Sequence, residues 1–210
     1  AYDTADKIDD VIEESLDFAF DEKFGYLTAC PTNAGTGLRA SVMMHLPALT
    51  MTQNIGKVIH ASTGLGIEVR GLYGEGTKAY GNLYQISNRT TMGLTEKEIL
   101  EKLKGVVNQI IDMEEKARKL LTDNQKTATE DKIFRSYGIL KHARSISSSE
   151  ARELLSNVML GTETGILQTN GNLSPLECMI KSAPSLINGG KELSPEERDV
   201  VRAEFIRNNI

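Results

Sequence analysis

Residues 25–43 read GYLTACPTNAGTGLRASVM, and this segment decides how the chain folds. Three glycines separate an apolar entry from a β-rich exit, which predicts a strand, a tight loop and a second strand. A glycine-rich loop lets backbone N–H groups approach a ligand closely, and the planar guanidinium of Arg39 at its end suits a phosphate group. The segment indicates a phosphate-binding loop, with a simple surface turn as the alternative.

A second arginine, Arg70, lies near the end of another predicted strand. Residues 67–73 and 81–87 are rich in strand-forming side chains, and a glycine-containing loop at 74–78 joins them into an antiparallel hairpin. If the strands that carry Arg39 and Arg70 are neighbours, both guanidinium groups can converge on one triphosphate. Together with Mg²⁺ they would then stabilise a transferring phosphoryl group. Two exposed arginines in separate surface ion pairs are the alternative.

Apolar residues at helical spacing flank these strands. They predict helices over residues 5–20, 49–61 and 95–121, and Thr95 with Glu98 forms a capping box at the start of the last one. The polar stretch 122–129 has few core-forming residues, which predicts a domain boundary. Every later segment has helical periodicity. The sequence thus predicts an α+β fold, with a mainly antiparallel sheet flanked by helices over residues 1–121 and an all-helical domain over residues 122–210.

Composition narrows the class of protein. The chain has 210 residues, 40% of them hydrophobic, so it can bury a core. Its net charge of −5 argues against nucleic acid as the main partner. No apolar run is as long as a membrane span, no signal peptide opens the chain, and the two cysteines are far apart, which indicates a cytoplasmic protein. The chain begins inside a predicted helix without a start methionine, so we expect a portion of a longer protein.

Metal and P-loop signatures are absent from the sequence. The three histidines are scattered without ligand spacing, and no Walker motif occurs. Cys178 lies at an apolar helix position and is predicted to be core. Cys30 lies in the glycine-rich loop, where a thiol of lowered pKa and an inert buried residue are both open, the inert residue being favoured.

The last predicted helix begins at Ser194-Pro195, with Glu197 as capping partner, and carries two arginines on one face. Arg198 and Arg202 stand at i and i+4, and Asp199 can accept a hydrogen bond from a guanidinium. A solvated charged face and a site for one shared anionic ligand both explain this pattern, the solvated face being favoured.

Longer stretches resemble a known family. GYLTACPTNAGTGLRASVMMHLP and EVRGLYGEGTKAYGNLYQISNRTTMGLTEKE are similar to two nucleotide-contacting blocks of the phosphagen (guanidino) kinases. RDVVRA in the helical tail resembles the R-D-x-x-R-A motif with which bacterial protein-arginine kinases bind phosphoarginine. The resemblance covers nearly the whole chain. It implies transfer of the ATP γ-phosphoryl group to arginine side chains of proteins, with Mg²⁺ held mainly through the nucleotide phosphates.

The resemblance also assigns roles to residues and partners. Cys30 matches the family's active-site cysteine, which positions or polarises the guanidinium region and is not a covalent nucleophile. ATP would contact Arg39, Ala40, Ser41, Val42, Met43, Arg70, Gly71, Leu72, Tyr73, Gly74 and Glu75. Phosphoarginine would bind as an allosteric ligand to Arg198, Asp199, Arg202 and Ala203. The implied setting is a bacterial stress response, with a homodimer, an activator protein and a Clp-type chaperone and protease that degrades marked proteins.

The chain departs from the family pattern in two ways. The N-E-E-D-H segment, which supplies the carboxylate that activates the acceptor guanidinium, is absent, as is an upstream arginine-bearing segment that also binds ATP. We therefore expect a C-terminal portion that is inactive alone. The mobile loop of the small-molecule kinases reads G-E-H-T-E, whereas residues 74–78 here read GEGTK, which favours a protein substrate. The alternatives are a non-enzymatic phosphoarginine-binding module and a small-molecule guanidino kinase.

Overall fold

The computed structural model describes residues 1–72, 79–190 and 192–210. The predicted ATP contacts Tyr73, Gly74 and Glu75, and the rest of the 74–78 loop, lie outside the described residues. The elements in chain order are α1 (Tyr2–Glu13), β1 (Phe20–Asp21), β2 (Gly25–Tyr26), η1 (Pro31–Asn33), β3 (Ser41–His45), α2 (Pro47–Met51), α3 (Ile55–Gly64), β4 (Ile67–Gly71), η2 (Tyr80–Asn82), β5 (Leu83–Asn88), α4 (Glu96–Asn124), α5 (Lys126–His142), α6 (Ser148–Glu163), α7 (Pro175–Lys181), α8 (Pro184–Ile187) and α9 (Pro195–Asn209).

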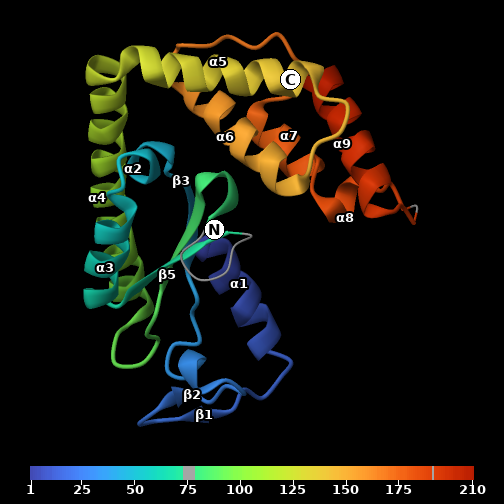
Figure 1. The fold of residues 1–210 in the computed structure, drawn as a ribbon. Coiled ribbons are helices and arrows are strands. Elements are labelled where there is room, and N and C mark those ends of the chain that lie inside the picture. Colours follow the sequence, from blue (N-terminus) through green and yellow to red (C-terminus); the bar gives the residue numbers. More distant parts are fainter. Residues whose placement is uncertain (73–78, 191) are drawn as a thin grey trace.

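The central sheet has three antiparallel strands in the order β3-β5-β4. Ser41 of β3 and Glu68 of β4 both lie opposite Ser87 of β5, so the register places the two outer strands level with each other. β1 and β2 form a separate antiparallel pair at the far end of the molecule from the helical bundle (Figure 1). The predicted α+β class and the predicted β4–β5 pairing are confirmed.

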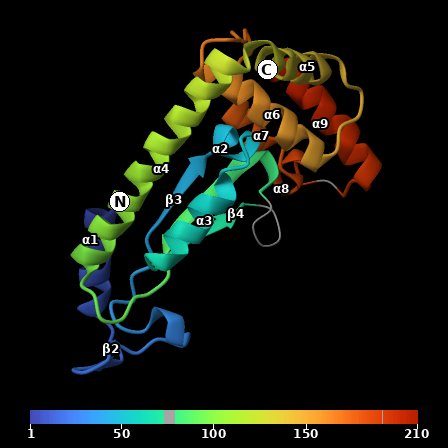
Figure 2. The same cartoon turned by 60° about the vertical axis from the view of Figure 1, so that its left-hand side comes forward.

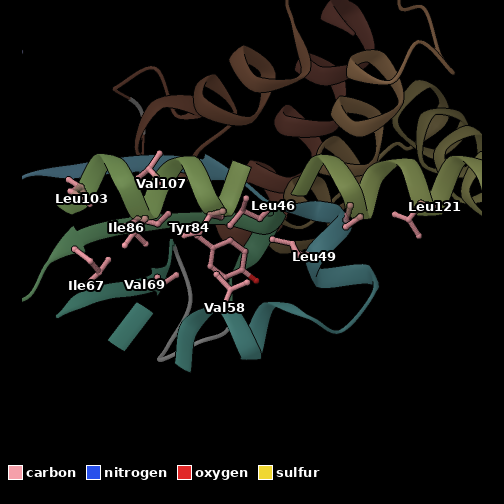
Figure 3. Close-up of a cluster of buried hydrophobic side chains, with 14 residues drawn as sticks. Leu46, Leu49, Val58, Ile67, Val69, Tyr84, Ile86, Leu103, Val107 and Leu121 are labelled. Atoms are coloured by element: carbon pink, nitrogen blue, oxygen red, sulfur yellow. The ribbon is translucent and has the colours of Figure 1, made fainter. Parts of the chain in front are cut away.

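The main core lies between this sheet and helices α3 and α4. Tyr84 and Ile86 of β5 are 2% and 0% exposed and lie among Val58 of α3 and Leu103 and Val107 of α4 (Figure 3). Burial of one such aliphatic side chain stabilises the fold by about 1.5–3 kcal/mol. Because strand side chains alternate, this face of the sheet is apolar, and the opposite face carries mostly polar residues together with Met43 and Leu83.

The long helix α4 connects the sheet to the helical bundle (Figure 2). It begins with the predicted capping box, in which Glu98 N donates to Thr95 Oγ1 (3.3 Å) and Thr95 N donates to Glu98 Oε2 (2.7 Å). The polar segment 122–129 is helical on both sides of Gln125, which ends α4 and precedes α5. Thr129 is buried and donates to Leu121 O (3.3 Å), which fixes the corner between the two helices.

Helices α5 to α9 enclose a second core. Leu155, Val158 and Cys178 are each 0% exposed, so the predicted core position of Cys178 is confirmed, and burial raises the pKa of its thiol to about 11. Serine N-caps at 147, 174 and 194 start α6, α7 and α9. In the part of the chain that the structure describes, no helix is both long enough and apolar enough to cross a membrane.

Two predicted helices differ from the structure. The helix predicted over 5–20 ends at Glu13, because Phe20 pairs with Tyr26 in the β1–β2 ladder. The rings of these two residues pack edge to face, with their centroids 5.2 Å apart. The single helix predicted over 49–61 is two helices, since Gln53 has a left-handed φ of 59° between them. The first of them starts at Pro47, where the carboxylate of Glu114 accepts from Ala48 N and Leu49 N.

Candidate functional site

The polar face of the central sheet carries part of the predicted site, whereas the predicted contact Val42 lies on the opposite face with Ile86. Met43, Gln85 and Arg70 lie in one row across the three strands, and Ser41, Ser87 and Glu68 lie in the next. Strand alternation places all six on the face opposite Tyr84 and Ile86. Gln85 Nε2 donates to Ser41 Oγ (3.1 Å), which links β5 to β3 on this face.

Arg39 and Arg70 converge on one carboxylate. Arg70 Nη2 lies 2.8 Å from Glu68 Oε1, and Arg39 Nη2 lies 3.9 Å from Glu68 Oε2. The two surface ion pairs are not separate, because they share Glu68 although β5 separates β3 from β4; that both arginines bind one triphosphate stays a prediction. The arginine side chains are 37% and 64% exposed, and such ion pairs contribute at most about 1 kcal/mol each, so an anion with several charges can compete with Glu68.

Two residues that the sequence analysis did not single out shape the loop before β3. Asn88 is buried at the end of β5, accepts from Ala40 N (2.8 Å) and donates to Leu38 O (2.9 Å). Thr91 Oγ1 lies within donor distance of Ala34 O (2.6 Å). Polar residues at the end of a strand are a sequence signal for such contacts. The sequence does not identify their partners, which lie about fifty residues earlier in the chain. These contacts place Arg39 at the entry to β3.

The loop glycines serve close packing more than ligand approach. Gly35 has φ +103°, and a β-carbon on it would lie 2.5 Å from Thr91 O. A β-carbon on Gly25 would lie 2.5 Å from Gly35 O. Gly37, by contrast, has φ +68° with open space around it. Of these three glycines only Gly37 leaves room beside the backbone for a ligand.

Cys30 is exposed in the loop between β2 and η1, so the interpretation as an inert buried residue is wrong. Its Sγ lies 3.0 Å from Thr32 Oγ1. Hydrogen bonds from Thr32 and, less strongly, the positive charge of Arg39 lower the pKa of the Cys30 thiol below its usual value. The structure therefore brings Cys30 into the electrostatic surroundings of Arg39, at the same end of the sheet.

The residues predicted to bind phosphoarginine divide between surface and core. Arg202 is 2% exposed and donates to Ser182 O (3.1 Å), Ile146 O (2.9 Å) and Asp199 Oδ1 (2.5 Å). Ala203 is 1% exposed, whereas Arg198 and Asp199 are half-buried. Within the described residues Arg198 has no ion pair. That all four bind one ligand stays a prediction, and the structure gives Arg202 a structural role as well.

Comparison with known proteins decides the family. Residues 1–117 match the family model described as ATP:guanido phosphotransferase, C-terminal catalytic domain. The chain belongs to the ATP:guanido phosphotransferase family. Residues 126–210 match a second model, described as the protein-arginine kinase McsB C-terminal domain. The predicted family resemblance is thus confirmed.

Two relatives that are similar to this chain along its whole length are called protein-arginine kinases. The one from Halothermothrix orenii is 53% identical over 212 residues, with 100% of this chain and 61% of the relative covered. The one from Brevibacillus brevis is 49% identical over 215 residues, with 100% and 59% covered. The chain therefore spans about three fifths of the length of the curated relatives it matches.

Two solved structures match about half of this chain. Lombricine kinase is 34% identical, with 51% of this chain and 29% of that chain covered and a TM-score of 0.43. The substrate-free duplicated taurocyamine kinase from Schistosoma mansoni is 30% identical, with 52% and 14% covered and a TM-score of 0.43.

Proposed function

We propose that this chain supplies the nucleotide-binding and regulatory part of a protein-arginine kinase. In the reaction a guanidino nitrogen of a protein arginine attacks the γ-phosphorus of ATP, and the bond from that phosphorus to ADP breaks. The guanidinium proton passes to a base, because a protonated guanidinium is a poor nucleophile. The observation that carries the proposal is the convergence of Arg39 and Arg70 on Glu68 at the polar face of the sheet.

These residues stabilise charge and do not act as the base. Two arginines one strand apart can share the negative charge of a transferring phosphoryl group, as phosphoryl-transfer catalysis requires. In this site Glu68 is already paired with both of them. The resemblance assigns the base to an N-E-E-D-H segment, which this sequence does not contain. We therefore expect the 210-residue chain to bind nucleotide weakly and to form no phosphoarginine alone.

Mg²⁺ would enter this site on the nucleotide. Among the described residues no group of three or more histidine, cysteine or acidic side chains is placed to hold a metal ion. Arg39 and Arg70 are cations that cannot ligate a metal ion, and Glu68 is paired with both, so this site fits a metal held mainly through the nucleotide phosphates. When bound, Mg²⁺ would neutralise part of the phosphate charge.

The test measures phosphoryl transfer in the whole protein. Mass spectrometry of an arginine-containing protein substrate with ATP should detect phosphoarginine, and Arg70→Ala should lower kcat/KM at least about a hundredfold. Arg135→Ala is a matched control, since Arg135 also forms an exposed 2.8 Å ion pair, with Asp131 on α5. Free arginine should not be turned over. Equal activity of the two variants would contradict the role of the sheet arginines.

The helical part supports a regulatory role in the same proposal. Arg198 lacks an ion pair within the described residues and stands beside Asp199, which favours an anionic ligand such as phosphoarginine at the start of α9. Titration calorimetry with a phosphoarginine peptide should show weaker binding to Arg198→Ala than to wild type. Binding without any kinase activity of the whole protein would instead support a non-enzymatic phosphoarginine-binding module.

The wider setting belongs to the proposal too. Protein substrates with exposed arginines, a homodimer, an activator protein and a Clp-type protease that receives marked proteins follow from the family resemblance, as does a cytoplasmic stress response. The match of residues 126–210 to the McsB C-terminal domain supports the protein-arginine kinase activity on which this setting depends. Sedimentation of the whole protein would test the dimer.

A further inference from the structure

A buried polar cluster joins the end of the nucleotide strand β3 to the helical bundle. His45, the last residue of β3, has a side chain that is 5% exposed, and its Nε2 lies 2.8 Å from Ser156 Oγ on α6. Asn82 Nδ2 donates to the same hydroxyl at 2.8 Å. Ser156 is 0% exposed. A buried polar group without a partner costs about 1–3 kcal/mol, so the three side chains hold one another in place.

Polar side chains continue from this cluster to α4. His45 Nδ1, which has no hydrogen bond within the described residues, lies 3.8 Å from Glu163 Oε2, and Arg118 Nη1 lies 2.7 Å from that same oxygen. Arg118 Nε in turn lies 2.9 Å from Glu114 Oε1, and Glu114 accepts from the first N–H groups of α2. Because α2 follows β3 directly, the bundle and α4 hold this strand on both sides of Leu46.

The backbone at this contact adopts uncommon conformations. Asn82 has a left-handed φ of 54°, and its carbonyl accepts from Leu46 N at 2.9 Å. The preceding Gly81 has φ +72°, and a β-carbon on it would lie 3.1 Å from Arg152 O of α6. Asparagine tolerates the left-handed region better than most residues, whereas a side chain at Gly81 would crowd the backbone of α6. Gly81 therefore permits the close approach of η2 to α6.

We propose that His45 is a positioning residue that couples the helical bundle to the nucleotide face of the sheet. The expected effect on ATP binding rests on the proposed function, but the coupling between α6 and β3 depends only on the fold. Ser41 and His45 are the two ends of one five-residue strand, which β5 pairs along its whole length. A shift of α6 at His45 would therefore be transmitted to Ser41, about 13 Å away along the extended strand, and to Arg39 two residues before it.

Amide hydrogen exchange of the 210-residue chain tests the coupling. Ser156→Ala removes the hydroxyl that contacts His45, while Ser136→Ala removes a buried hydroxyl that accepts from Asn157 at 3.0 Å within the bundle. Loss of a hydrogen bond of about 1.4 kcal/mol corresponds to tenfold in an equilibrium. Ser156→Ala should therefore speed exchange at residues 42–45 about tenfold over Ser136→Ala. Equal rates would overturn the proposal.

Kinetics of the whole protein give the second readout. Ser156→Ala should raise the KM for ATP several-fold more than it lowers kcat, and Ser136→Ala should change neither.

His45→Gln, whose amide can still reach Ser156, should retain more nucleotide affinity than His45→Leu. The same KM for both His45 variants would refute positioning through this contact. If Ser156→Ala does not fold, the test compares amide exchange at residues 42–45 in His45→Leu with that in Ser136→Ala. An inactive wild-type protein would refute the proposed function, whereas the exchange rates would still test the coupling between α6 and β3.

Discussion

Replacement of Arg202 by alanine should lower the urea concentration at which the helical bundle unfolds far more than a substitution on its surface does. Its guanidinium is the donor for Ile146 O and Ser182 O, and both of these residues are 3% exposed. Charge-assisted hydrogen bonds contribute about 1.5–3 kcal/mol each, and both carbonyls would lose this donor. Asp199 is 32% exposed at its side chain, so water can replace Arg202 there. We expect a total loss of about 3–5 kcal/mol.

Urea unfolding followed by far-ultraviolet circular dichroism measures this loss. A loss of this size lowers Tm by about 10 °C in a chain of this length. Arg198→Ala is the matched control on the same helix and should change stability by less than about 0.5 kcal/mol. Arg202→Lys should lie between them, because an ammonium group lacks the fork that reaches two carbonyls. Losses for Arg202→Ala and Arg198→Ala that agree within about 1 kcal/mol would refute the structural role.

Three further predictions concern the site and the contact with the bundle. Gly35→Ala should destabilise the chain by roughly 2–4 kcal/mol and Gly37→Ala by only about 1 kcal/mol in the same urea assay, since only the first β-carbon would meet backbone. Burial raises the pKa of Glu163, but His45 and Arg118 outweigh it and hold this pKa below its usual value. Its stabilising contribution is therefore present above pH 4.5 and lost as the pH falls through the lowered pKa, so Glu163→Gln should flatten stability against pH in that acidic range. Thr32→Val should raise the pKa of the Cys30 thiol and slow its alkylation by iodoacetamide at neutral pH, with unchanged rates counting against the Thr32 contact.

Features with local causes could be predicted from the sequence. The capping boxes predicted at Thr95 and Ser194 depend on residues three positions apart, and both form. The β4–β5 pairing follows from two strand-forming segments with a short connection. The helix predicted over 5–20 was too long, because a ladder between Phe20 and Tyr26 decides where it ends, and apolar spacing does not report strand pairing.

The relative placement of the two sheet arginines could be predicted only in part. Sequence placed Arg39 and Arg70 near strand ends, but the strand order β3-β5-β4 was needed to show that Glu68 links them. The i, i+4 spacing of Arg198 and Arg202 shows that they share a side of α9 without showing how deeply each is buried. The bundle decides that Arg202 points inward to carbonyls of segments fifty-six and twenty residues earlier.

Both ends of β3 are held from elsewhere in the chain, and this arrangement joins the sheet and the bundle into one functional unit. At its entry, Asn88 fixes the backbone of Ala40 beside Arg39. At its exit, His45 contacts Ser156 of α6, and Glu163 links the strand to Arg118 on α4. A shift of α6 would therefore reach β3 through His45. Under the proposed function, the helical part could then regulate the proposed nucleotide site without direct contact between phosphoarginine and ATP.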